Sequence, residues 1–78
     1  MPRLLAVEGF RFFFFSNERS EPPHVHVERG DGVAKFWLEP VALDSSSGLK
    51  TQELRRARIL VVEHQTTFRE KWRERFGT

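Results

Sequence analysis

Two histidines stand one residue apart in the segment Pro-Pro-His-Val-His-Val-Glu at residues 22–28. Alternate residues of a strand point to the same side, so His24 and His26 would lie with their Cβ atoms about 7 Å apart, followed by Glu28 on the same face. Two imidazoles placed in this way can bind one metal ion or one phosphate group. The alternative is that both histidines are exposed on a strand beside Trp37 and have no catalytic role.

A metal site would need more ligands than this pair provides. Closed sites take three or four ligands, the chain has no cysteine, and only Glu28 or a more distant residue could complete the set. We therefore expect no bound metal and no other cofactor, and we retain His24 and His26 only as candidate metal ligands.

The third histidine, His64, falls within an apolar stripe of a predicted helix, where a histidine is typically a core residue that bonds a backbone carbonyl. If it instead reached the sheet near His24, neutral imidazoles would meet Arg11 or Lys35, which could stabilise developing negative charge. That arrangement would be a metal-independent ribonuclease site. His24, His26 and His64 are therefore the candidate catalytic residues, and the pattern leaves open whether the protein is an enzyme.

The elements that must position these side chains follow from the apolar pattern. Apolar and aromatic runs, with a Gly-Asp-Gly turn at residues 30–32 and Pro40 as a terminator, predict strands at about residues 3–7, 10–16, 24–29 and 33–38. Apolar residues at steps of three or four predict a helix at about residues 51–76, with Lys50 or Thr51 as N-cap. We expect one α+β domain over residues 1–78: an antiparallel three- to four-stranded sheet in the order β-β-β-β-α. One long C-terminal helix would pack on one face, with room for a kink or break near residues 65–67.

Strand parity divides the side chains between two faces of this sheet. The core face receives Val25, Val27, Ala34, Phe36 and Leu38. The four consecutive phenylalanines at residues 12–15 must send two rings to each face, so Phe12 and Phe14 would enter the core. The second face carries His24 and His26 together with the candidate binding residues Arg11, Phe13, Phe15, Glu28, Lys35 and Trp37. Because His64 faces the core side, parity opposes a three-histidine site.

Composition limits the kinds of protein that this chain can be. Its 78 residues allow one small domain, the absence of cysteine excludes a disulfide framework, and no apolar run approaches the roughly 20 residues of a membrane span. The N-terminus lacks the apolar stretch of a signal peptide, so we expect a soluble cytoplasmic protein with no membrane partner. Net charge is +2, and residues 51–78 carry seven basic and four acidic residues. Such a segment can attract a polyanion or an acidic partner, although it is also common on a solvated helix.

The order of motifs resembles a small prokaryotic family, the domain of unknown function 4160, over nearly the whole chain. The resemblance rests on Gly9, the aromatic strand, Ser16-Asn17-Glu18, the Pro-His-x-His element, Gly30, the run Ala34-Lys35-Phe36-Trp37-Leu38, Glu53-Leu54, and His64 with Trp72. It implies a stand-alone α+β protein, often encoded beside another small protein and suspected of being the toxin-like half of a toxin-antitoxin pair. It supplies no catalytic residues, so it only emphasises Pro23, His24, His26, His64 and Trp72. Lys50-Thr51 departs from the Ser or Pro that opens the helix in many relatives.

Three functions remain compatible with these observations. The first is a toxin-like component of a toxin-antitoxin pair that acts on or binds RNA. The alternative is a non-enzymatic protein-interaction or regulatory module, an antitoxin-like partner, that uses the exposed aromatic sheet face to bind a small partner protein or a second copy of itself. A face that mixes aromatic rings with Arg and Lys also resembles a base-stacking platform. The third is a metal-binding protein that uses His24 and His26.

Overall fold

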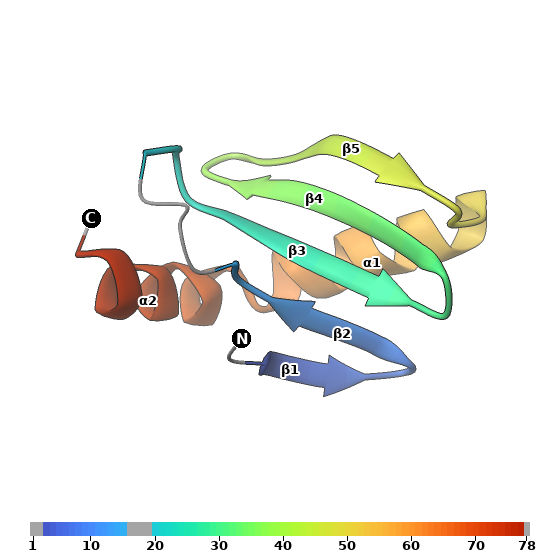
Figure 1. Cartoon of the computed structure of the whole chain (residues 1–78), viewed down its shortest axis with the longest axis horizontal. Coiled ribbons are helices and arrows are strands. Elements are labelled where there is room, and N and C mark those ends of the chain that lie inside the picture. The colour runs from blue at the N-terminus through green and yellow to red at the C-terminus, as the bar shows by residue number, and fades with distance from the viewer. Residues whose placement is uncertain (1–2, 16–19, 78) are drawn as a thin grey trace.

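The structure of this protein is a computed structural model that describes residues 3–15 and 20–77. Its five strands form one antiparallel sheet whose spatial order follows the chain, so each strand pairs with the next one in sequence. In Figure 1, α1 lies behind the sheet and α2 continues past the end of the sheet where β3 begins. The elements are β1 (Arg3–Val7), β2 (Phe10–Phe13), β3 (His24–Arg29), β4 (Gly32–Leu38), β5 (Val41–Ser47), α1 (Thr51–Glu63) and α2 (Gln65–Phe76).

The sheet has five strands, whereas the sequence predicts three to four. Glu39 and Pro40 turn the chain back, and β5 pairs with β4 from Val41 opposite Leu38 to Ser47 opposite Val33, with a bulge near Lys35. The sequence pattern missed this strand because residues 43–48 are all exposed, so no alternation of apolar and polar residues marks them.

Two further boundaries differ from the prediction. The aromatic strand ends at Phe13 instead of residue 16. The residues beyond it that carry part of the family resemblance, Ser16-Asn17-Glu18, lie outside the described residues.

The predicted long helix at residues 51–76 is two helices that meet at His64. His64 has φ −108° and ψ 14°, outside the helical region, although its N–H still donates to the Leu60 carbonyl and its own carbonyl accepts from Phe68 N–H. The Gln65 side chain donates to the Leu38 carbonyl, which ties the junction to the end of β4. The junction lies next to residues 65–67, where the sequence leaves room for a kink or break, although the apolar stripe itself is continuous because both helices keep their apolar residues toward the same core.

Lys50 is the N-cap of α1, and its backbone N–H donates to the Glu53 carboxylate at 2.8 Å. Gly77 ends α2 in the left-handed region, at φ 75°. Within the described residues, neither helix is long and apolar enough to cross a membrane.

The core lies between the helices and one face of the sheet, and it is rich in aromatic rings. At one end of the core, the ring of Trp72 lies 5.2 Å from that of Phe14 and 4.3 Å from that of Phe76, centroid to centroid. The rings of Phe68 and Phe12 pack with centroids 5.4 Å apart. The buried apolar residues are Phe10, Phe12, Phe14, Val25, Val27, Ala34, Phe36, Leu38, Ala57, Leu60, Val61, Phe68, Trp72 and Phe76. The core face predicted from parity is therefore confirmed, and half of the Phe12 to Phe15 run belongs to it.

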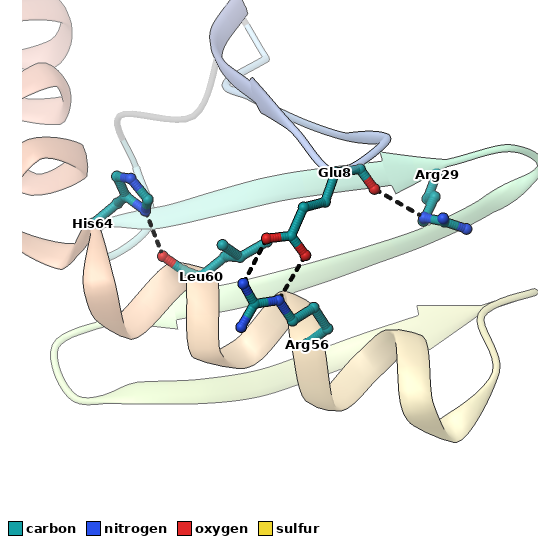
Figure 2. Close-up of polar contacts among 5 residues, drawn as sticks. All are labelled: Glu8, Arg29, Arg56, Leu60 and His64. Atoms are coloured by element: carbon teal, nitrogen blue, oxygen red, sulfur yellow. Dashed lines mark hydrogen bonds and ion pairs between the residues drawn. The ribbon is translucent and has the colours of Figure 1, made fainter.

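Ion pairs join the first hairpin to α1 across the edge of the core (Figure 2). The turn residues Glu8 and Gly9 have positive φ angles of 55° and 81°, as a tight hairpin turn requires. The Glu8 carboxylate accepts two hydrogen bonds from the Arg56 guanidinium, one of them from Nε at 2.6 Å. Arg29 donates to the Glu8 carbonyl and to the Glu53 carboxylate. The turn, the third strand and the helix are thus held together by charged hydrogen bonds.

Candidate functional site

The face of the sheet turned away from α1 carries the candidate binding residues in three rows. Antiparallel pairing places residues of neighbouring strands directly opposite one another, so two rows run across β2 to β5 and a third runs across β3 to β5. We call this surface the open face, because α1 packs on the other side of the sheet; only its end at His24 is covered, by Trp72 of α2. Its rows are Arg11, Glu28, Val33 and Ser47; Phe13, His26, Lys35 and Ser45; and His24, Trp37 and Ala42.

Three rings form an aromatic cluster on the open face. Phe13 stacks on His26 with centroids 5.8 Å apart, and Phe15 meets His26 edge-on at 4.3 Å and Phe13 at 5.3 Å. Phe15 is 42% exposed although it is large and apolar. Parity alone predicted that Phe13 and Phe15 would leave the core, and the structure agrees.

A hollow of about 310 Å³ opens beside this cluster. Along the row that crosses it, the rings of Phe13 and His26 come first, Lys35 follows, and Ser45 of β5 is last. The lining residues are Phe13, Phe15, His26, Val27, Val33, Ala34, Lys35, Ser45, Ser46 and Ser47. Its size is at the lower end of the range for small-ligand pockets, and its surface is mainly apolar, so it suits one ring-sized or branched apolar group.

Arg11 and Lys35, the two cations in these rows, each have a carboxylate partner. Arg11 Nε lies 2.8 Å from Glu28 Oε1, and Lys35 Nζ lies 2.6 Å from Glu21 Oε1. Lys35 also lies 4.0 Å from the Asp44 carboxylate and 4.6 Å from the centre of the Trp37 ring. Phosphate binding draws its affinity from uncompensated positive charge, and stabilisation of an oxyanion needs donors that are not already engaged. These pairings weaken the case for Arg11 and Lys35 as catalytic cations.

His24 departs from the expectation that it shares the exposed surface with His26. It is completely buried, at 0% exposure, and its ring packs 4.9 Å from Trp72 and 5.5 Å from Trp37. Its Nδ1 lies 2.9 Å from the Pro22 carbonyl, so the Nδ1–H tautomer can donate to that oxygen. The reason is positional: His24 is the first residue of β3, and α2 extends past the end of the sheet there and covers it with Trp72.

His64 lies at the junction of the two helices and makes the contacts of a structural histidine. Its Nδ1 is 2.9 Å from the Leu60 carbonyl, as Figure 2 shows, and its ring packs 5.9 Å from Phe68. Among the described residues it makes no ring contact with His24 or His26, which contact each other at 5.2 Å. The structure therefore does not assemble the three histidines into one site.

No set of three or more His, Asp or Glu side chains with the geometry to hold a metal ion occurs among residues 3–15 and 20–77. His24 and His26 are neighbours, but burial of the first leaves only the second within reach of solvent at the open face.

Sequence analysis missed the residues that complete the open face from β5 and from the loop before β3. Ser45 and Ser47 line the hollow, while Glu21 and Asp44 neutralise Lys35. One signal was available: the alternating strand at residues 33–38 is followed by a Glu-Pro turn and by the apolar residues Val-Ala-Leu, a sequence that can return as a paired strand.

Comparison with known proteins agrees with the resemblance noted in the sequence. A family model described as "Domain of unknown function (DUF4160)" matches residues 9–73. No curated protein and no solved structure matches the chain.

Proposed function

This chain belongs to the DUF4160 family, and we propose that it is a non-enzymatic protein-interaction module whose open face binds a small partner protein. The observation that carries the proposal is the half-exposed aromatic cluster of Phe13, Phe15 and His26 beside a ring-sized hollow. An apolar or aromatic side chain of the partner would fill the hollow and bury Phe15.

The composition of the open face supports a protein partner. Interfaces are enriched in aromatic anchors and are surrounded by polar rims, and anchor residues in desolvated pockets contribute most of the binding energy. Here the aromatic cluster supplies the anchor, and the pairs Arg11 with Glu28 and Lys35 with Glu21 supply a rim without net charge. Such a rim favours a partner that is also nearly neutral where it docks.

The positions of the histidines support a role without catalysis. A general base must reach the proton that it removes within hydrogen-bond distance, directly or through one water. His24 is enclosed by aromatic rings, and His64 is engaged at the helix junction. Of the three histidines only His26 lines the hollow, and a single imidazole that stacks on Phe13 and meets Phe15 edge-on acts most simply as part of the anchor.

The family resemblance implies that such a protein is often encoded beside another small protein, and the test is a binding measurement with a neighbour of this kind. Calorimetric titration of wild type should give a saturable complex, and Phe15→Ala should weaken it at least tenfold, as expected for a central anchor. Lys71→Ala, an exposed change on α2, serves as control and should bind like wild type. Sedimentation of the protein alone shows whether a second copy takes the partner's place. Phe15→Ala binding indistinguishable from wild type would refute the proposal.

A second function, a toxin-like component that acts on or binds RNA, has one specific feature in its favour. The hollow is large enough for one nucleobase and has aromatic rings on one side with Lys35 and serine hydroxyls on the other. Induced expression of wild type, Phe15→Ala and His26→Ala separates it from the first proposal. RNA action predicts growth arrest and RNA loss with wild type alone. His24 is left unchanged in this test because its substitution would disturb the core.

A further inference from the structure

A second surface, on the helix side of the sheet, also leaves apolar residues exposed. Leu43 of β5 is 46% exposed, and Ile59 and Val62 of α1 are 47% and 53% exposed. A hollow of about 340 Å³ lies between these elements and is lined by Val41 and Leu43 from the strand and by Leu54, Arg55 and Arg58 from the helix. We call this surface the β5–α1 groove.

Helical spacing extends this groove along α1. Residues 55, 58, 59 and 62 fall at i, i+3, i+4 and i+7, the spacing that places side chains on one side of a helix. Arg55 and Arg58 line the hollow, so Ile59 and Val62 continue the same side toward the helix junction. Three of the five large apolar side chains that are exposed in the described residues therefore belong to this surface.

The two arginines of the groove differ from five other cations of the described residues, which form ion pairs. Arg11, Arg29, Lys35, Arg56 and Arg69 each pair with a carboxylate. Arg55 and Arg58 have no acidic partner among the described residues. The groove thus combines aliphatic side chains with two uncompensated positive charges, which complements a segment that is both acidic and apolar.

The backbone beside the groove is also available. β5 is the last strand of the sheet and pairs with β4 alone in the described part of the chain, so its outer edge presents unpaired N–H and C=O groups. Residues 41–43 of this edge are Val-Ala-Leu and carry no charge that would repel a further strand. An extended peptide can add to such an edge through main-chain hydrogen bonds while its alternate side chains enter a neighbouring pocket.

We propose that the β5–α1 groove is a docking site for an acidic, partly apolar segment of a partner protein, which adds to the sheet as a sixth strand beside β5. Apolar side chains of the segment lie against Leu43, Ile59 and Val62, and its carboxylates pair with Arg55 and Arg58. The groove lies on the opposite side of the sheet from the open face, so this proposal does not depend on what binds there.

Two other occupants fit the groove less well. A second copy paired through β5 would bring its own Arg55 and Arg58 toward the same two cations, and the one acidic residue of β5, Asp44, is 4.0 Å from Lys35 already. An RNA strand would gain from aromatic rings on which bases stack, whereas the exposed apolar side chains of this groove are aliphatic.

The test uses a synthetic peptide that alternates glutamate with valine or leucine, titrated into the isotopically labelled full chain at low salt and followed by amide NMR. We expect saturable shifts confined to residues 41–47 and 55–62. Arg55→Glu/Arg58→Glu should weaken binding at least tenfold, whereas Lys71→Glu/Arg73→Glu, with the same charge change on α2, should not. A peptide with lysine in place of glutamate should not bind. Methylation of alternate backbone nitrogens of the glutamate peptide, on the edge that would pair with β5, should abolish binding.

Several outcomes would overturn the proposal. If the amides of β5 do not shift, the peptide binds elsewhere. If both charge-reversal variants lose the same affinity for the peptide, binding depends on overall charge only. A dimer in sedimentation that Leu43→Glu dissociates would assign the groove to a second copy. Displacement of the peptide by a single-stranded oligoribonucleotide that shifts the same amides would assign it to RNA. Because the shifts are read residue by residue, failure here is separable from failure of the open-face proposal, which Phe15→Ala tests.

Discussion

The imidazole of His24 lies against the indole of Trp72, with ring centroids 4.9 Å apart, and this contact closes the end of the sheet. Trp72 also meets Phe14 edge-on at 5.2 Å, so one tryptophan of α2 covers residues from both β3 and the chain after β2. The sequence predicts that His24 is exposed on a strand beside His26, whereas the structure makes it a core residue. The two histidines should therefore differ in how much they contribute to stability.

His24→Ala should destabilise the fold, whereas His26→Ala should have a small effect. Removing the fully buried ring leaves a cavity among aromatic neighbours, and we expect a loss of about 3 kcal/mol in the free energy of unfolding. His26 is only half-buried, and its loss should cost less than about 1 kcal/mol. Urea denaturation followed by tryptophan fluorescence compares the two variants. Equal destabilisation would contradict the assignment of His24 to the core.

The pair of Glu8 and Arg56 predicts an acid-dependent loss of stability. The hydrogen bond from Arg56 holds the pKa of Glu8 below its ordinary value of 4.5. A carboxyl whose folded-state pKa is depressed stabilises the fold above its unfolded pKa, and the contribution disappears as pH falls through the folded pKa. Wild type should therefore be more stable than Glu8→Gln at pH 7, and the two should converge in strong acid.

Denaturation curves at several pH values and at low and high salt provide the measurement. Glu70→Gln, on the exposed surface of α2, is the control and should follow wild type across the range. A difference between wild type and Glu8→Gln that stays constant down to the lowest pH would exclude an ionic origin. Because both partners are exposed, added salt should reduce the difference at pH 7.

Gly32→Ala should destabilise the fold because the loop after β5 leaves no room for a methyl group at residue 32. A Cβ at residue 32 would come within 2.5 Å of the Leu49 side chain and 2.7 Å of the Gly48 carbonyl oxygen, which is backbone and cannot rotate away. We expect a loss of about 2 kcal/mol. Gly30→Asn is the matched control: its Cβ meets nothing within 4 Å, and asparagine tolerates the positive φ of 58° there. Thermal melts that place both variants at the same midpoint would argue against close packing at residue 32.

Zinc should neither bind tightly nor stabilise this protein. His24 is enclosed, and the described residues offer no set of three ligands around His26. Addition of a small excess of zinc should move the melting midpoint by less than about 1 °C, since only a ligand that binds the folded state stabilises it. Elemental analysis of tag-free protein should find no stoichiometric metal. A saturable rise of several degrees that His26→Ala removes would restore the metal hypothesis.

Some features of the candidate site could be predicted from local pattern because they depend on local geometry. Side chains alternate along any strand, so the outward direction of Phe13, Phe15 and Trp37 follows once the strands are recognised. The Gly-Asp-Gly turn allows two registers of β3 against β4 that share the same faces, and the structure has the one in which Arg29 pairs with Gly32 and His26 lies opposite Lys35. The family match over residues 9–73 agrees with the order of these motifs.

Other features depend on residues far apart in the chain. β5 has no burial pattern of its own, and it is a strand because the edge of β4 needs a partner for its hydrogen bonds. The neutralisation of Lys35 by Glu21, and the pairing of Arg56 with Glu8 at a separation of 48 residues, have no signature in spacing.

The sequence by itself determined the α+β class, the two faces of the sheet and the division of the aromatic residues between them. Side chains repeat their direction every two residues in a strand and every three to four in a helix because of backbone geometry, so the apolar pattern shows these periods in any element that is long enough. Only the tertiary structure decided which polar residues remain accessible. It buried His24 under Trp72, kept His64 at a helix junction and left Arg55 and Arg58 beside an open strand edge. The physical reason is that burial and charge compensation depend on which distant side chains fill the space around a residue, and no local pattern contains that information.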